Sequence, residues 1–171
     1  MAKKREWREY ENVAHELLNR MASEFGLTRV LPDQQVTGQV SGTEWNIEGK
    51  ALVDGSDIFL IVECRRYTTS KIKQEAVGGL AFRIYDSMAA GGIIVTPLGL
   101  QEGAAKVASS QNITTVLLTP QSTTTEYIMT VLHDTWSRTY MGVSSDALLV
   151  EEATVDRKDV VDKTPDEPDA A

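Results

Sequence analysis

The sequence has few of the residues on which several common kinds of site depend. Its 171 residues include one cysteine and two histidines, so it offers neither an internal disulfide nor a Cys/His cluster for zinc. A single cysteine agrees with a reducing compartment, and we expect a cytoplasmic protein. No apolar run approaches the roughly 20 residues that cross a bilayer, so no membrane partner is expected. The basic start at Lys3–Arg5 is not followed by the apolar segment of a secretory signal.

The sequence also lacks the motifs of two other common kinds of site. The glycine pairs Gly78-Gly79 and Gly91-Gly92 lack the G-x-G-x-x-G context of dinucleotide-binding folds. His15 and His133 have no nucleophile elbow near them, which disfavours serine-histidine-acid chemistry. We expect both histidines at the surface.

Acidic residues outnumber basic ones, but unevenly along the chain. The net charge is -8, and residues 151–171 contribute -5 of it, which leaves -3 for residues 1–150. Overall charge therefore does not exclude a nucleic-acid partner, because binding depends on where the basic side chains lie. We predict one folded domain over residues 1–143 and an acidic, largely disordered tail over residues 144–171.

The most informative stretch is an apolar run that ends in charged residues. Ile58–Val62 follows the turn signal Asp54–Asp57 and reads as a strand that is buried on both faces. Side chains alternate along a strand, so Glu63 and Arg65 lie on the same face. A carboxylate at the end of a core strand is costly to bury unless a cation or hydrogen bonds meet it. This placement suggests a functional site.

The remaining pattern predicts alternating strands and helices. We expect a hairpin, then parallel crossovers, which together form a mixed sheet flanked by helices. Gly78-Gly79 is expected to let its helix approach the sheet closely, and Thr123 with Glu126 offers a capping box for a last helix. The expected helices are 5–25, 71–89, one around 100–108 and 123–136, and the expected strands are 34–40, 45–53, 58–62, 93–96 and 113–118.

The hairpin should bring a second carboxylate to the first. Glu48 lies fifteen residues before Glu63, on the adjacent predicted strand. One interpretation of this pair is a site, and the other is a structural salt bridge to Arg65 or Arg66, since ion pairs at strand ends also resemble sites.

The ordered motifs resemble those of the restriction-endonuclease-like superfamily, in which an acid and a variable spacer precede Asp/Glu-x-Lys. Glu63-Cys64-Arg65-Arg66-Tyr67 is similar to the Glu/Gln-Cys-Lys-Arg-Tyr segment of its Mrr-type branch, and Tyr10-Glu11 to the opening helix of that branch. Gln74 occupies the glutamine position of the following helix. The resemblance implies an α/β restriction-endonuclease-like fold with a mixed sheet.

The resemblance also implies a divalent-metal-dependent DNA endonuclease that hydrolyses phosphodiester bonds. Mg²⁺ or Mn²⁺ would be held by carboxylates and a backbone oxygen, and DNA would be the partner, with a homodimer as a further possibility. The implied metal ligands are Glu48, Glu63 and the carbonyl of Cys64. The other implied catalytic residues are Arg65, Gln74 and Glu11. The implied DNA-contacting residues are Arg66, Tyr67, Lys71 and Lys73, with Arg83 on the same phosphate-facing edge.

Two positions depart from the pattern. Glu48 stands where the family usually has aspartate, and Arg65 stands where it has lysine. Arginine keeps the positive charge, but it stays protonated and so cannot transfer a proton, and Lys50, Lys71 or Lys73 would have to supply a lysine. The alternative is therefore a catalytically impaired nuclease-fold protein that binds DNA or protein. A purely structural role would be favoured if the acids and Arg65 formed a closed ion-pair cluster.

Overall fold

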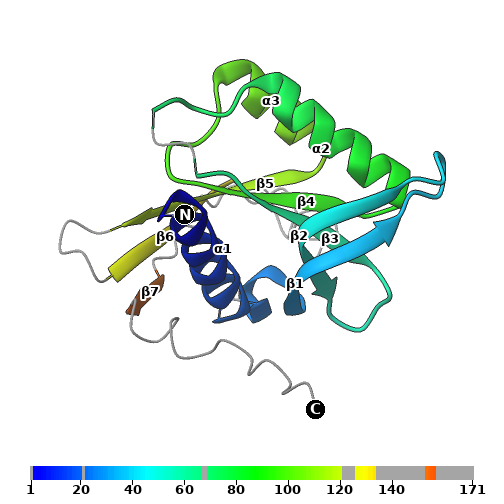
Figure 1. Ribbon diagram of the computed structural model, residues 1–171. Helices are drawn as coiled ribbons and strands as arrows, with labels where there is room; N and C mark the ends of the chain where they lie inside the picture. The colour runs from blue at the N-terminus through cyan, green and yellow to red at the C-terminus, as the bar shows by residue number, and fades with distance from the viewer. Residues whose placement is uncertain (1, 21, 67–68, 121–125, 134–152, 157–171) are drawn as a thin grey trace, which may run out of the picture.

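A mixed sheet of seven strands forms the centre of the computed structural model, which describes residues 2–20, 22–66, 69–120, 126–133 and 153–156. Helix α1 (Ala2–Arg20) covers one face, and α2 (Gln74–Ser87) and α3 (Glu102–Ser110) cover the other (Figure 1). The strands, in their order across the sheet, are β1 (Leu27–Thr37), β2 (Glu44–Val53), β3 (Phe59–Cys64), β4 (Gly91–Thr96), β5 (Ile113–Pro120), β6 (Glu126–His133) and β7 (Ala153–Asp156).

The strand directions confirm the predicted mixed sheet. Strands β1, β2 and β3 are antiparallel neighbours, and β3, β4 and β5 are parallel and connected through α2 and α3. A short 3-10 helix (Ala22–Phe25) connects α1 to β1. Strand β1 starts earlier than the predicted strand 34–40 and passes through Pro32. This proline is tolerated because β1 is an edge strand of the sheet.

Two apolar cores lie on opposite faces of β3. Leu60, Val62 and Cys64 pack on the side of α1, whereas Ile61 packs on the side of α2 and α3. Glu63 shares the Ile61 face, because side chains alternate along a strand. The end of β3 therefore presents its carboxylate on the side of α2.

The β1–β2 hairpin twists so that its two halves serve different cores. Val30 and Ala51 pack with α1, whereas Val36 and Ile47 pack with α2. The change of face along β2 falls between Ile47 and Ala51 and so includes Glu48. Strand twist, which is strong in two-stranded ribbons, accounts for this change.

A buried aspartate attaches the hairpin to the end of α2. Asp86 is fully buried, and its Oδ1 accepts hydrogen bonds from the backbone N–H groups of Val40 and Ser41 at 3.2 and 2.7 Å. Its Oδ2 accepts from Ser41 Oγ and Trp45 Nε1, both at 2.6 Å. These bonds lower the pKa of Asp86, with the Ser41 and Trp45 side chains as the largest causes. The network fixes α2 relative to the hairpin that carries Glu48.

Helix α2 differs from its prediction at two places. A Cβ added at Gly78 or Gly79 would meet nothing within 4 Å, so these glycines do not serve a close approach to the sheet. The helix ends at Ser87 and is capped by Met88, whose φ of 57° is left-handed and whose N–H donates to the carbonyls of Ile84 and Tyr85. Gly91 and Gly92 belong to β4, which starts two residues before the predicted strand 93–96.

The C-terminal part also departs from the sequence-based prediction. Glu126–His133 is strand β6 rather than a helix, because this β-branched and aromatic segment pairs with β5; Thr123 lies outside the described residues. Ala153–Asp156 is strand β7, paired with β6, inside the tail that we predicted to be largely disordered. In the described part of the chain, no helix combines the length and apolar character that crossing a membrane requires.

Candidate active site

Glu48 lies where the β2–β3 ladder opens. The last paired residues are Gly49 and Val62, and the next outward-pointing amide of β3, the N–H of Cys64, donates to Oε2 of Glu48. The side chain thus replaces a backbone acceptor at the end of the ladder. This contact brings Glu48 to the end of β3, beside Glu63, as the predicted hairpin requires.

Both oxygens of Glu63 face guanidinium groups. Glu63 is only 3% exposed; its Oε1 forms an ion pair with Arg65 Nη2, and its Oε2 lies 2.8 Å from Nη2 of Arg83 on α2. The Arg83 contact is an ion pair without hydrogen-bond geometry, since Oε2 has no hydrogen-bond partner in the described part of the chain. The two positive charges compensate for the burial of this carboxylate.

The carboxylates influence one another. Burial, the largest cause, and the negative charges of Glu63 and Glu11 together raise the pKa of Glu48 from 4.5 to about 7, against the opposing effects of the Cys64 N–H and Arg65. Glu11, on α1, is half-buried and therefore contributes to the same electrostatic environment. Glu48 is thus coupled electrostatically to the two other acids predicted from the sequence, and it holds its proton up to near neutral pH.

Of the remaining predicted residues, Cys64 is buried and the basic residues are half-buried or exposed. Cys64 is fully buried on the α1 side, where burial raises the pKa of its thiol, so only its backbone carbonyl is available as a ligand. Arg66 is half-buried, and Lys71 and Lys73 are exposed on the segment that leads into α2. Tyr67 lies outside the described residues.

Two predicted contributors do not reach the carboxylates. The carboxamide of Gln74 lies against Gly103 of α3, where a Cβ would come within 2.5 Å of its Oε1. Gln74 makes no hydrogen bond with Glu48 or Glu63, so the structure gives its predicted catalytic role no contact. Lys50 lies with its Nζ 4.3 Å from the centroid of the Phe59 ring and therefore does not supply the missing lysine in this arrangement.

The sequence did not assign several residues that surround the acids. Arg83 was expected only on a phosphate-facing edge; its pairing with Glu63 depends on how α2 sits on the sheet, which no local pattern reveals. Asp33 lies opposite Glu48, between the Pro32–Gly49 and Gln34–Ile47 pairs, and has a strained φ of 45°. That strain is a signal only the backbone geometry provides.

Two buried polar groups lie nearby. His15, expected at the surface, is buried, and its Nε2 lies 3.0 Å from where a Cβ of Gly49 would stand. Thr96 is fully buried and follows Val95, the residue whose carbonyl accepts from the N–H of Arg65. Within the described residues, neither His15 Nε2 nor Thr96 Oγ1 has a hydrogen-bond partner.

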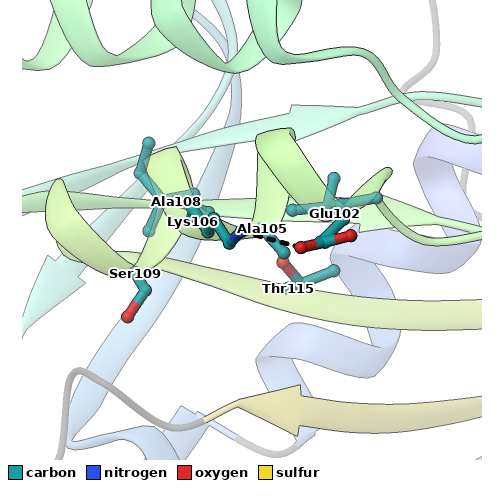
Figure 2. Close-up of a pocket in the computed structure, with 8 residues that line it drawn as sticks. Glu102, Ala105, Lys106, Ala108, Ser109 and Thr115 are labelled. Carbon is teal, nitrogen blue, oxygen red and sulfur yellow. Dashed lines mark hydrogen bonds and ion pairs between the residues drawn. The ribbon is translucent and has the colours of Figure 1, made fainter.

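The structure has two pockets of interest, and only one of them includes a predicted site residue. A polar pocket of about 360 Å³ on the β1–β2 hairpin includes Glu48 in its wall, together with Asp33, Gln34, Gln35, Asn46 and Ile47. A second pocket, of about 480 Å³, lies between α3 and β5, where Figure 2 shows Lys106 pairing with Glu102 across the helix surface. No predicted site residue lines this second pocket.

The donor atoms at the site fit a hard divalent cation in kind. Carboxylate and backbone carbonyl oxygens are the ligands that Mg²⁺ takes, and the like-charged pair Glu48 and Glu63 would be stabilised by a cation. In the described part of the chain, however, no three acidic, histidine or cysteine side chains are already arranged around a metal position. A cation at Glu63 would compete with its two guanidinium partners.

Residues 2–121 match the Mrr catalytic family, described as restriction endonuclease. The chain is also similar to the crystal structure of a protein of unknown function, AF1548, with a TM-score of 0.51, 20% identity and coverage of 62% of this chain and 56% of that one. At this identity the likeness shows the fold alone. No curated protein is significantly similar in sequence. Because the family match spans more than half of its length, the chain belongs to the Mrr-type restriction endonuclease family.

Proposed function

We propose that this protein is a divalent-metal-dependent DNA endonuclease that uses Glu48, Glu63 and the carbonyl of Cys64. The observation that carries the proposal is the opening of the β2–β3 ladder, where the carboxylate of Glu48 meets the end of β3 and is coupled to Glu63. Two coupled carboxylates, one half-buried and one buried, are the donors that a metal-dependent hydrolase needs. The family match supports nuclease chemistry as the reaction class.

Each residue of the chain has a distinct task in this proposal. Mg²⁺ or Mn²⁺, when bound, would activate water and neutralise phosphate charge. Glu48 must lose its proton to serve as a ligand, so its raised pKa makes cation binding stronger as pH rises through about 7. Arg65 would stabilise the charge that develops on the phosphate but cannot accept a proton. Glu11 would act as an outer carboxylate on the α1 side.

DNA would be bound mainly through its phosphates. The basic residues Arg66, Lys71 and Lys73 lie between β3 and α2 in the chain, and the two lysines are exposed. Such contacts give affinity that falls steeply with salt and carry little sequence information. The expected homodimer and the cytoplasmic location both stay predictions.

Cleavage of plasmid DNA in Mg²⁺ or Mn²⁺ tests the proposed activity. Glu48→Ala and Glu63→Ala should each abolish cleavage, because each removes a metal ligand. Arg65→Ala should raise the barrier by about 2–4 kcal/mol, the usual result of losing one preorganised charge donor. Arg65→Lys should keep or increase activity. Glu102→Ala, which removes an exposed acid on α3, should cleave like the wild type.

A second candidate function is a nuclease-fold protein that binds DNA or protein without cleaving. The pairing of both Glu63 oxygens with Arg65 and Arg83 favours it, because these guanidinium groups occupy the positions that a cation would neutralise. Inert wild type with active Arg65→Lys would identify a disabled nuclease and favour this binding role. Inert protein in every variant, with no metal bound, would rule out the proposed enzyme.

A further inference from the structure

The two arginines on Glu63 are held in different ways. Arg83 comes from the interior of α2 and its side chain is 16% exposed, whereas Arg65 follows the last residue of β3 and its side chain is 34% exposed. Each binds a different oxygen of the same carboxylate. Arg65 is therefore the partner that can leave with less rearrangement of the surrounding structure.

The charges around Glu63 oppose simple cation binding. The acids Glu11, Glu48 and Glu63 are grouped with Arg65 and Arg83, so the five side chains carry a net charge of only about -1 when all are ionised. Removing one guanidinium from Glu63 restores negative charge. It also leaves that guanidinium in need of another anion, because an unpaired, half-buried cation is costly.

We propose that Arg83 holds Glu63 in place while Arg65 exchanges between Oε1 of Glu63 and a DNA phosphate, so that DNA and the divalent cation each strengthen the binding of the other. Arginine suits this exchange because its planar donors bind carboxylate and phosphate alike. Oε1, released by Arg65, becomes the oxygen that faces the cation, and Oε2 stays on Arg83. The inference rests on the proposed function, since it assumes the metal site at Glu48 and Glu63.

Calorimetric titration of Mn²⁺ into the full chain, with and without a short phosphorothioate DNA duplex that resists hydrolysis, tests the exchange. In the wild type, DNA should increase the Mn²⁺ affinity by about 5- to 150-fold, the range typical of coupled sites. Arg65→Met should bind Mn²⁺ more tightly than the wild type without DNA, because Oε1 is already released. DNA should then change its Mn²⁺ affinity by less than about twofold.

The Arg83 variants separate the two roles. In Arg83→Met, DNA should still strengthen Mn²⁺ binding, because Arg65 can still exchange. Arg83→Lys, which keeps the charge, should show the same coupling. Arg20→Met removes a similar charge from an exposed ion pair on α1 and should behave like the wild type. Melting curves establish that each variant is folded.

Particular outcomes would overturn the exchange. Equal Mn²⁺ affinity with and without DNA in the wild type would contradict it, as would Arg65→Met that binds Mn²⁺ no more tightly than the wild type. Coupled Mn²⁺ and DNA binding without cleavage would support the exchange and contradict the proposed nuclease activity. No Mn²⁺ binding under any condition would contradict both.

Discussion

At the scale of single residues, the account depends on the protonation of Glu48. Its carboxyl is half-buried, faces two other acids and hydrogen-bonds through Oε2 to the N–H of Cys64. Burial is the largest cause of its raised pKa, which means that ionising Glu48 is costly in the absence of a cation. The same property that makes Glu48 a candidate ligand should destabilise the metal-free protein at alkaline pH.

Glu48→Gln should therefore stabilise the metal-free protein above neutral pH. With a folded-state pKa of about 7 instead of 4.5, Glu48 binds more protons in the folded state than in the unfolded state between these values. The wild type should lose about 3 kcal/mol as pH rises across this window and nothing further above it. Glutamine stays neutral and still accepts from the Cys64 N–H, so the variant should not show this loss.

Melting temperatures of the wild type and Glu48→Gln, measured from pH 5 to pH 8 in chelator, check this prediction. The two curves should separate as pH rises, whereas Glu102→Gln, at an exposed acid, should follow the wild type. Parallel curves for the wild type and Glu48→Gln would mean that Glu48 ionises in the folded protein as it does in the unfolded chain.

The sequence allowed the acid pair to be predicted but not its neighbours. Glu48 and Glu63 follow from a hairpin whose turn and strands have clear local signals, so their approach depends only on antiparallel pairing. Arg83 and Asp33 depend on the placement of α2 and on backbone strain, which sequence periodicity does not encode. Gln74 had the right position in the family pattern but faces α3 instead.

At the scale of elements, α2 contains two glycines that lower the stability of the helix without allowing a closer packing contact. Gly78 and Gly79 lie inside the helix, yet the space where their Cβ atoms would stand is open. Glycine in a helix interior costs about 1 kcal/mol relative to alanine. The orientation of α2 instead depends on its buried residues and on Asp86, which attaches its end to the hairpin.

Gly79→Ala should accordingly stabilise the protein by about 1 kcal/mol. Gly92→Ala, in β4, is the matched control: its Cβ would lie 3.0 Å from Ile84 Cδ1 and 3.3 Å from the carbonyl oxygen of Ile61, so it should destabilise the protein. Urea unfolding with an unchanged slope measures both effects. A destabilised Gly79→Ala would show that the backbone at this position needs a glycine.

The predictions of elements succeeded where local and long-range preferences agree. Helix α1 and strands β2 to β5 have clear periodicity and were found near their predicted positions. Strand β6 shows the opposite case, because Thr123 and Glu126 suggest a helix start while pairing with β5 favours a strand. Tertiary pairing decided the outcome, as it commonly does for short segments with mixed propensity.

At the scale of the whole molecule, the C-terminal part extends the sheet. Strand β7 pairs with β6 and covers what would otherwise be an open edge. A chain that ends at residue 150 should therefore melt several degrees lower than one that ends at residue 156, since each kcal/mol is worth roughly 2–4 °C in a protein of this size. Equal melting temperatures would restore the expectation that the tail takes no part in the fold.

The arrangement of the whole molecule places the candidate site where the two cores meet. Glu11 approaches from α1, Arg83 approaches from α2, and Glu48 lies on the hairpin that twists from one core to the other. Such a position holds the acids on regular elements rather than on loops, which favours precise placement of metal ligands. The central claim is that these acids hold a divalent cation when DNA is bound.

Anomalous diffraction from crystals of the protein with phosphorothioate duplex DNA and Mn²⁺ tests this claim most directly. The account predicts a manganese peak between the carboxylates of Glu48 and Glu63, with the Cys64 carbonyl as a ligand and Arg65 on a phosphate. A map with DNA present, no manganese peak at this position and Glu63 still paired with both Arg65 and Arg83 would contradict it.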